Sequence, residues 1–504
     1  MTQEVPLSAP YEDGDDAGFA MRVRSALAWR WGTQVFAQLI TWASTFAVIR
    51  ILTPADYGLF AMTQAVLTAL AFLNGYSFAT SLIQAKEIDD RRVGQVFGML
   101  IVAGVGLAIV QSLFAPVAAA YYGQPMVEDM LRVQAVIFLA TPFIALPSAL
   151  LARRIEFRNQ GLVNLLCAVV GASTALILAL GGSGVWALVF APIAMAAARA
   201  IGLTISAKLL VKPVFDFRGA WDIVSFGGAL TLCQFLWIVQ SQSDVLIAGP
   251  AFSPGDLGIY TTSLFLVLII TGKFIPPINE VLFPALSELA KTGRPLAPFF
   301  IRTLRTVALV TAPLYIGLAL TAEATVLTIA GDKWADMIPI IAGLTLAMPF
   351  FALQIVCSPA TNAIGKPRIY VATSTAGAIL FPAAFLIGVS SGPMGLVHAW
   401  WFTAPALLAI TLALTLPAIE VRIGDLLKQL FPVAVACALM AAVVTAVKSV
   451  LPEMAAPFEL AILAATGGVT YGAALWMLWP HILTETWAML RSRKANPADV
   501  VTPA

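Results

Sequence analysis

Polar and charged residues inside long apolar segments are the places where this sequence could do chemistry. Lys273 stands in the apolar stretch 257–283 and is followed by Pro276 and Pro277. Each proline removes a backbone N–H donor, so we expect the helix to bend or open beside the lysine. A cation next to an interrupted helix is a common way to hold an anionic group inside a membrane. The alternatives are an ion pair with Glu280, which lies on the same helix face, or an interfacial position of the lysine.

Two polar stripes follow helical spacing in other apolar segments. The first stripe comprises Gln34, Gln38, Thr41 and Thr45, and the second comprises Gln234, Ser241 and Asp244. Each stripe could line a central cavity, but hydrogen bonds between neighbouring helices would explain the same residues. An ionisable residue inside a membrane is a functional-site hypothesis by default, so Asp244, and with it Glu280, is the candidate for ion coupling.

The sequence contains no catalytic or metal-ligating constellation. The two histidines are far apart, and the four cysteines match no metal or disulfide spacing. The acidic residues outside the apolar segments lie in short turns rather than in a loop that could form an acid/base pair. We therefore expect no enzymatic activity, no metal and no cofactor, which leaves coupling to a proton or sodium gradient as the open question about ions.

Composition places the chain in a membrane. Of its 504 residues, 60% are hydrophobic and 11% are charged, against about 25% charged residues in a soluble domain. Apolar runs of about 20 residues, long enough to cross about 30 Å of hydrocarbon as helices, recur between residues 32 and 480. We predict an all-α integral membrane protein with about fourteen transmembrane helices. The net charge of +2 gives no sign of a nucleic-acid partner, because the cations are spread over short loops rather than gathered on one face, and we expect none.

The distribution of cations predicts the orientation. Most of the 29 Lys and Arg residues fall in the even-numbered connections and in the two tails of the predicted helices. Cationic loops are retained on the cytoplasmic side of a membrane. We therefore predict that both termini are cytoplasmic.

One hexapeptide occurs twice, as TPADYG at residues 53–58 and as SPGDLG at residues 253–258. Its hydroxyl residue suits a helix N-cap, its proline the first helical position and its aspartate the third. Six predicted helices separate the copies, and other strings recur in the same order, such as ATPF and AMPF. A parallel duplication of this kind implies two six-helix bundles related by a pseudo-two-fold axis along the membrane normal.

This duplication defines the predicted domains. They are a cytoplasmic tail at 1–31 that is largely disordered at its start, a six-helix bundle at 32–206, an amphipathic cytoplasmic linker at 207–221, a second six-helix bundle at 222–417, two further helices at 418–487 and a cytoplasmic tail at 488–504.

A set of short strings, in order along nearly the whole chain, resembles one known family. They are LTPADYGLFAM, SLIQAKEI, LPSALLARRIEFR, GVWALV, SDVLIAG, LGIY, VLFPALSEL, GDKW and NAIGKPR. In these strings and in its six-plus-six-plus-two helices, the chain resembles the Wzx-like flippases of lipid-linked oligosaccharides. Those proteins form the polysaccharide-transport branch of the multidrug/oligosaccharidyl-lipid/polysaccharide superfamily.

The resemblance implies a function, a partner and a location. It implies a flippase of the bacterial cytoplasmic (inner) membrane that moves undecaprenyl-diphosphate-linked oligosaccharide repeat units by alternating access, for exopolysaccharide, capsule or O-antigen assembly. Lys273 would then hold the diphosphate, with Gln34, Gln38, Gln234 and Ser241 lining the cavity, and membrane lipids and a polymerase machinery would be the other partners. The alternatives are a cation-coupled drug exporter of the same superfamily and a membrane-embedded polysaccharide polymerase or glycosyltransferase.

Overall fold

The computed structural model describes residues 16–71, 73, 89–154, 156–209, 211–217 and 221–480. This part of the chain is helical and contains no strand, which confirms the all-α prediction. Within it, eleven helical segments are long and apolar enough to cross a membrane. One of them, at 367–418, contains two of the fourteen predicted spans, and α2 (Pro54–Ala71) and α10 (Trp221–Ala248) overlap the two spans that remain. The predicted tail at 488–504 and the start of the tail at 1–31 lie outside the described residues.

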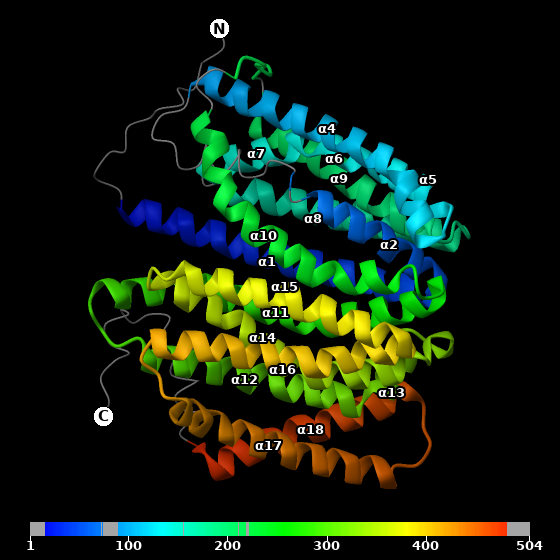
Figure 1. The fold of residues 1–504 in the computed structure, drawn as a ribbon, viewed down its shortest axis with the longest axis vertical. Coiled ribbons are helices and arrows are strands. Elements are labelled where there is room, and N and C mark those ends of the chain that lie inside the picture. Colours follow the sequence, from blue (N-terminus) through cyan, green and yellow to red (C-terminus); the bar gives the residue numbers. More distant parts are fainter. Residues whose placement is uncertain are drawn as a thin grey trace. The chain divides into compact units, whose positions relative to one another are not determined.

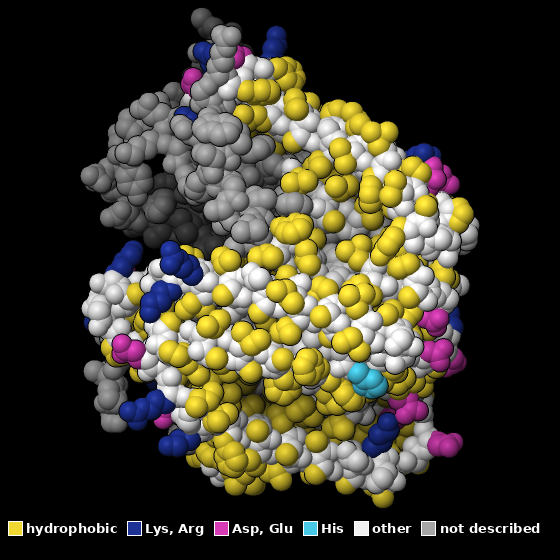
Figure 2. All heavy atoms as spheres, in the orientation of Figure 1, with side chains coloured by type: hydrophobic (Ala, Val, Ile, Leu, Met, Phe, Trp, Pro, Cys, Tyr) yellow, Lys and Arg dark blue, Asp and Glu magenta, His cyan; other side chains and the backbone are white. Residues whose placement is uncertain are grey.

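The outer surface of the helices is apolar, as a lipid solvent requires. Helix α4 (Asp90–Tyr122), for example, exposes a stripe of large hydrophobic side chains that includes Val102, Ile109 and Leu113. Figure 2 shows hydrophobic side chains over the middle of the helices of the second unit described below and charged side chains towards the helix ends. Contiguous apolar patches of this size are rare on soluble monomers. The chain is a multi-pass membrane protein.

By packing, the chain divides into two compact units. Of the described residues, the first unit takes those within Met1–Ile51, Leu70–Ala120 and Pro125–Thr231, and the second takes Leu52–Ala69, Tyr121–Gln124 and those from Leu232 onwards. This division departs from the predicted bundles at 32–206 and 222–417 because most of α2 and the end of α4 pack with the later helices.

The first unit is built around α8 (Phe157–Leu180), which lies between α1 (Asp16–Ile51) and α9 (Trp186–Ala207) in Figure 1. Thr33 of α1 fits against Gly161 of α8, where an added β-carbon would lie 2.6 Å from the threonine oxygen. The other face of α9 receives three shorter helices that together cover one predicted span. These are α5 (Met126–Gln134), α6 (Val136–Ala140) and α7 (Pro142–Arg153).

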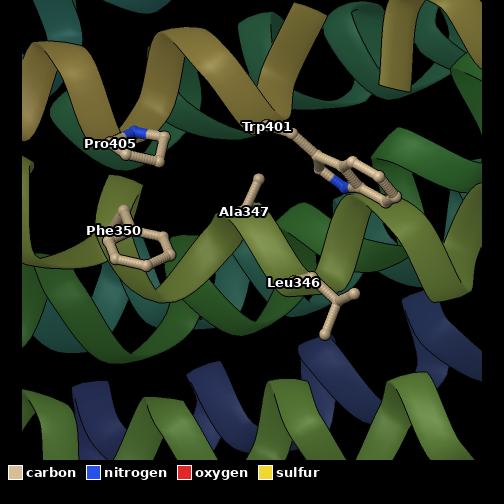
Figure 3. A pocket seen from close by; sticks show the side chains of 5 residues that line it. All are labelled: Leu346, Ala347, Phe350, Trp401 and Pro405. Atoms are coloured by element: carbon tan, nitrogen blue, oxygen red, sulfur yellow. The ribbon is translucent and has the colours of Figure 1, made fainter. Parts of the chain in front are cut away.

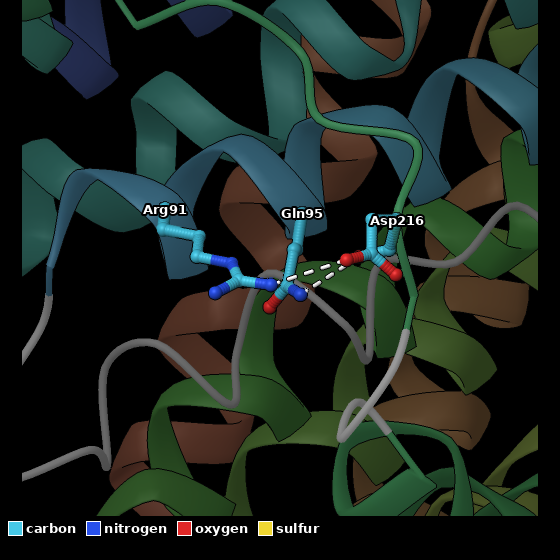
Figure 4. Close-up of polar contacts among 3 residues, drawn as sticks. All are labelled: Arg91, Gln95 and Asp216. Carbon is cyan, nitrogen blue, oxygen red and sulfur yellow. Dashed lines mark hydrogen bonds and ion pairs between the residues drawn. The ribbon is translucent and has the colours of Figure 1, made fainter.

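The segment after α9 is an extended strap rather than a helix. It begins at Lys208, whose left-handed backbone (φ 49°) ends α9, and residues 211–217 lie along the start of α4. The Val214 N–H donates to the Gly94 carbonyl (2.8 Å), Gln95 Nε2 donates to the Asp216 carbonyl (2.8 Å), and the Arg91 guanidinium pairs with the Asp216 carboxylate (3.1 Å; Figure 4).

The second unit is centred on α14 (Met337–Ala363), which packs against α11 (Pro254–Lys291), α12 (Ala297–Leu320) and α16 (Gly392–Ala418). Helix α15 (Pro367–Gly388) covers α16, and the short η2 (Val389–Ser391) joins the two. The last two helices, α17 (Ile423–Val450) and α18 (Ala456–Leu478), pair with each other and with α12 and α13 (Ala322–Ile329), as Figure 1 shows in orange and red. At one end an ion pair between Lys448 and Glu323 (3.1 Å) ties α17 to α13.

The sequence predicted a bend or an opening of the helix beside Lys273. The opening is wrong, because α11 runs uninterrupted from Pro254 to Lys291, whereas the bend stays a prediction. Its prolines remove individual N–H donors, but their φ angle is compatible with a helix. Packing on both sides of Pro276 and Pro277 outweighs the lost hydrogen bonds. Ile275 before the prolines and Leu286 after them are buried in one apolar cluster with α12 and α14.

Candidate functional site: a buried carboxylate

Helix α10 places the Asp244 carboxylate in the interior of the second unit, where the residue is only 3% exposed. Its Oδ2 accepts a hydrogen bond from the Tyr260 hydroxyl of α11 (3.2 Å). The Tyr260 oxygen in turn accepts one from Trp400 Nε1 of α16 (3.0 Å). A chain of hydrogen bonds therefore leads from α16 through α11 to the carboxylate on α10.

Aromatic side chains enclose this network. Trp400 makes edge contacts with Phe381 of α15, at a centroid distance of 4.7 Å, and with Phe351 of α14, at 5.4 Å. Tyr260 is fully buried, and Trp400 is 6% exposed. The enclosure lowers the local dielectric, which strengthens each polar contact and makes an unpaired charge costly.

The carboxylate has few donors for a buried anion. Besides Tyr260, its Oδ1 accepts from the backbone N–H of Val245 (2.8 Å). Among the described residues, no Lys or Arg forms an ion pair with Asp244. The Tyr122 hydroxyl, which lies within electrostatic range of Asp244, is buried without a hydrogen-bond partner in the described part of the chain. Such a site can carry a proton or a small cation that neutralises the carboxylate.

The other predicted residues of α10 do not join this network. Gln234 is exposed, and the half-buried Ser241 donates to the Ile238 carbonyl of its own helix (3.5 Å). Gln240, one turn before Asp244, is buried instead and lies so close to Gly377 of α15 that a β-carbon there would clash with its side-chain oxygen.

The polar stripe of α1 lies beside the packed face of that helix rather than on it. Gln34 and Thr41 are exposed, whereas Gln38 and Thr45 are half-buried, and the Thr41 hydroxyl donates to the Ala37 carbonyl of its own helix (2.8 Å). Ser44, on the packed face, forms a hydrogen bond to α8, in which its hydroxyl donates to the Ala172 carbonyl (3.2 Å). The role of Gln34 and Gln38 in a cavity stays a prediction.

Lys273 and Glu280 are both exposed on α11. Nineteen residues separate Lys273 from Pro254, which is about 28 Å along a helix. A hydrocarbon layer of about 30 Å that began where α11 begins would place Lys273 nearer its far boundary than its midplane. Exposed side chains at that depth can contact a polar headgroup, and the roles of both residues stay predictions.

A second cation lies inside the first unit. Arg199 of α9 donates from Nη2 to the side-chain oxygen of Asn164 on α8 (2.6 Å). Both residues lie seven to eight positions from one end of their helices, about 11 Å along the axis. Arg199 is therefore held inside the helical bundle by an amide.

An apolar groove lies between α14 and α16 (Figure 3). It has a volume of about 170 Å³ and is lined by Leu346, Ala347, Phe350, Trp401 and Pro405. The Trp401 indole N–H donates to the Gly343 carbonyl (2.7 Å), which fixes the ring at one end of the groove. With no charged side chain in its lining, the groove suits hydrocarbon and not a polar headgroup.

The sequence missed Tyr260 and Trp400. Tyr260 follows Asp244 by sixteen positions, with a turn between their helices, and Trp400 lies on α16, five α-helices after α11. No periodic pattern therefore links the three residues. The available signal was the position of Trp400 inside a predicted span rather than at its end, because tryptophans prefer the membrane interfaces and a buried indole N–H needs an acceptor.

Comparisons with known proteins place this geometry in context. The family model described as "Polysaccharide biosynthesis protein" matches residues 47–339, more than half of the chain. The succinoglycan biosynthesis transport protein ExoT of Rhizobium meliloti is 22% identical over 362 residues, which cover 70% of this chain and 73% of that protein. The teichuronic acid biosynthesis protein TuaB of Bacillus subtilis is 24% identical over 53% of this chain and 56% of that protein. The lipopolysaccharide biosynthesis protein WzxC of Escherichia coli is 19% identical over 58% of this chain and 60% of its own length.

Solved structures resemble the fold. A lipid II flippase, MurJ, in an inward closed conformation matches with a TM-score of 0.74 at 13% identity, over 90% of this chain and 99% of MurJ. An inward-facing multidrug resistance transporter of the MATE family matches with a TM-score of 0.61 at 12% identity, over 77% of this chain and 95% of that one. At these identities the likeness concerns the fold alone.

Proposed function

The chain belongs to the polysaccharide biosynthesis protein family, and we propose from this premise that it is a flippase for lipid-linked oligosaccharides. The match over residues 47–339 carries the proposal, and it agrees with the resemblance of the short sequence strings. Helices account for most of the described chain, and the described connections are short, such as residues 292–296 and 451–455. A protein built this way acts on a substrate within the membrane.

The proposed substrate is an undecaprenyl-diphosphate-linked oligosaccharide repeat unit that crosses the bacterial inner membrane. Two relatives are named for the biosynthesis of teichuronic acid and lipopolysaccharide, and a third for succinoglycan transport. An anionic headgroup needs a cation along its path, because an unpaired charge in hydrocarbon costs several kcal/mol, on the order of 3 or more. Lys273 would supply that cation, with the polar residues of α1 and α10 along the same path.

Asp244 would couple this movement to an ion gradient. A buried carboxylate with two described hydrogen-bond donors and a tyrosine hydroxyl nearby can exchange between a neutral and a charged form. The neutral and the charged form of Asp244 differ in how much they stabilise the packed helices around them. Such a difference couples ion binding to the conformation of the protein. In this proposal both termini are cytoplasmic, and a polymerase on the opposite side of the membrane receives the translocated oligosaccharide.

Leaflet exchange in proteoliposomes tests the function. Purified protein is reconstituted with radiolabelled undecaprenyl-diphosphate-linked oligosaccharide on one side, and a membrane-impermeant glycosidase reports the label that reaches the other leaflet. We expect label to cross with its chain length unchanged, faster than in protein-free vesicles and faster than with Lys273→Ala. Export of a small cationic dye without movement of the lipid would indicate the drug exporter instead, and a lengthened oligosaccharide would indicate a polymerase.

A further inference from the structure

The two copies of the repeated hexapeptide contact each other inside the second unit. A β-carbon on Gly58 would clash with the carbonyl oxygen of Pro254, and a β-carbon on Gly258 would clash with the carbonyl oxygen of Pro54. The same added atoms would lie 3.1 Å from the backbone nitrogen of Gly258 and 2.8 Å from that of Gly58. The contact is reciprocal, residue for residue, and only glycine at both positions permits it.

The helix starts that meet here are rigid. Thr53 and Asp56 form a capping box at the start of α2, with the Thr53 N–H donating to the Asp56 carboxylate (2.9 Å) and the Asp56 N–H to the threonine oxygen (3.3 Å). Ser253 caps the start of α11, where the Asp256 N–H donates to the serine oxygen (3.1 Å) and the serine hydroxyl donates to the Asp256 carboxylate (2.7 Å). Each cap fixes the first turn of its helix, so the glycine that follows is held in place.

Neighbouring residues reinforce the contact. The Tyr57 ring meets the fully buried Trp334 of η1 (Asp332–Trp334) edge to face at 5.5 Å. At the end of α4, the Tyr121 hydroxyl donates to the Leu246 carbonyl of α10 (2.7 Å). Tyr122 covers Gly249 so closely that a β-carbon there would clash with its ring. Elements from both sequence repeats are thus packed together at this end.

A reciprocal contact between two equivalent segments lies on the two-fold axis that relates them. In a transporter of two parallel repeats, the axis runs along the membrane normal and the substrate path lies on it. For a path that follows this axis, the Gly58–Gly258 contact would lie across its end, where α2 and α11 begin.

We propose that the two hexapeptides form a gate, which we call the glycine seam and define as residues 53–58 and 253–258. The seam closes one end of the path when α2 and α11 touch, and it must separate for the substrate to leave there. The two glycines set the balance between closed and open, because any side chain at either position forces the helices apart. The role of the seam as a gate rests on the proposed transport function, whereas the contact between the two glycines does not depend on it.

Distances between spin labels test the seam without reference to transport. Labels on Ala55→Cys and Gly255→Cys, equivalent positions of the two repeats, report the separation of the helix starts in purified, reconstituted protein. We expect one short distance in the otherwise unchanged chain. We expect a second, longer distance to dominate after Gly58→Leu or Gly258→Leu, a shift of about tenfold or more in the ratio of the two populations. Gly317→Leu on α12 is the matched control, since no atom lies within 4 Å of its added β-carbon, and it should leave the distance unchanged.

A cross-link tests the gate without touching the glycines of the contact, in case their variants fold poorly. A short bifunctional thiol reagent that joins the two introduced cysteines, at positions 55 and 255, should slow lipid movement by tenfold or more, and reductive release should restore it. Transport that continues across the closed link would overturn the gate while leaving the flippase proposal intact. If the unlinked protein moves no lipid, the flippase proposal fails. The distances between the spin labels still decide whether the seam opens. An unchanged short distance in both leucine variants would reject the seam.

Discussion

The hydrogen-bond chain from Trp400 through Tyr260 to Asp244 makes a quantitative prediction for Tyr260→Phe. The change keeps the fully buried ring and removes only its hydroxyl. Two hydrogen bonds are lost, of 3.2 Å to Asp244 and 3.0 Å from Trp400. The Trp400 N–H is then left buried without this acceptor, which costs about 1–3 kcal/mol, and the lost bond to a carboxylate adds about 1.5–3 kcal/mol.

We therefore expect Tyr260→Phe to lower the free energy of unfolding by about 2.5–6 kcal/mol. An ordinary hydrogen bond between membrane helices contributes about 0.6 kcal/mol. The size of the loss therefore distinguishes a buried network around a carboxylate from one ordinary interhelical hydrogen bond. Tyr315→Phe on α12 is the matched control: its hydroxyl also bonds across helices, to the Thr271 backbone N–H (3.1 Å) and to the Thr271 hydroxyl, but no carboxylate is involved. It should cost about 1–2 kcal/mol.

Unfolding in mixed micelles with increasing dodecyl sulfate, followed by circular dichroism, measures these differences. A double-mutant cycle with Asp244→Asn isolates the pair, and we expect a coupling energy of about 1 kcal/mol or more because the two side chains share one network. A cost below about 0.6 kcal/mol for Tyr260→Phe, or a coupling indistinguishable from zero, would refute the view that the network stabilises this region.

Three further predictions concern other parts of the molecule. Lys273→Ala should abolish lipid movement while Lys273→Arg retains part of it, because an arginine still supplies a charge to a phosphate; recovery of transport in the double variant with Glu280→Ala would show that the lysine only neutralises the glutamate. Asp244→Asn should make the rate of lipid exchange independent of an imposed proton or sodium gradient, and a rate that still follows the gradient would exclude Asp244 as the coupling residue. Gly98→Val should free the strap from α4, because its β-carbon would clash with the Val214 carbonyl, and faster proteolysis between residues 208 and 217 than in Gly106→Val, where the space is open, would reveal it.

The local features of this protein follow from its sequence alone. Apolar runs of membrane-spanning length fix the helices, since lipid offers the backbone no other partner. The N-caps of α2 and α11 were predicted from the hydroxyl, proline and aspartate of TPADYG and SPGDLG, and both are confirmed, because their hydrogen bonds join residues three positions apart. The family was also recognisable, since it is carried by short strings in a fixed order.

Only the tertiary structure decided which of these features meet. The repeat of the hexapeptide was visible in the sequence, but the contact between Gly58 and Gly258 joins positions 200 residues apart and depends on how α2 and α11 pack. Asp244 was singled out by its charge, whereas its partners Tyr260 and Trp400 lie on other helices with no shared periodicity. The prolines of α11 predicted a bend or an opening of the helix, and packing against α12 and α14 prevents the opening. Periodicity and capping act within one helix and are written along the chain, while long-range contacts depend on the joint fit of several helices, which no single segment encodes.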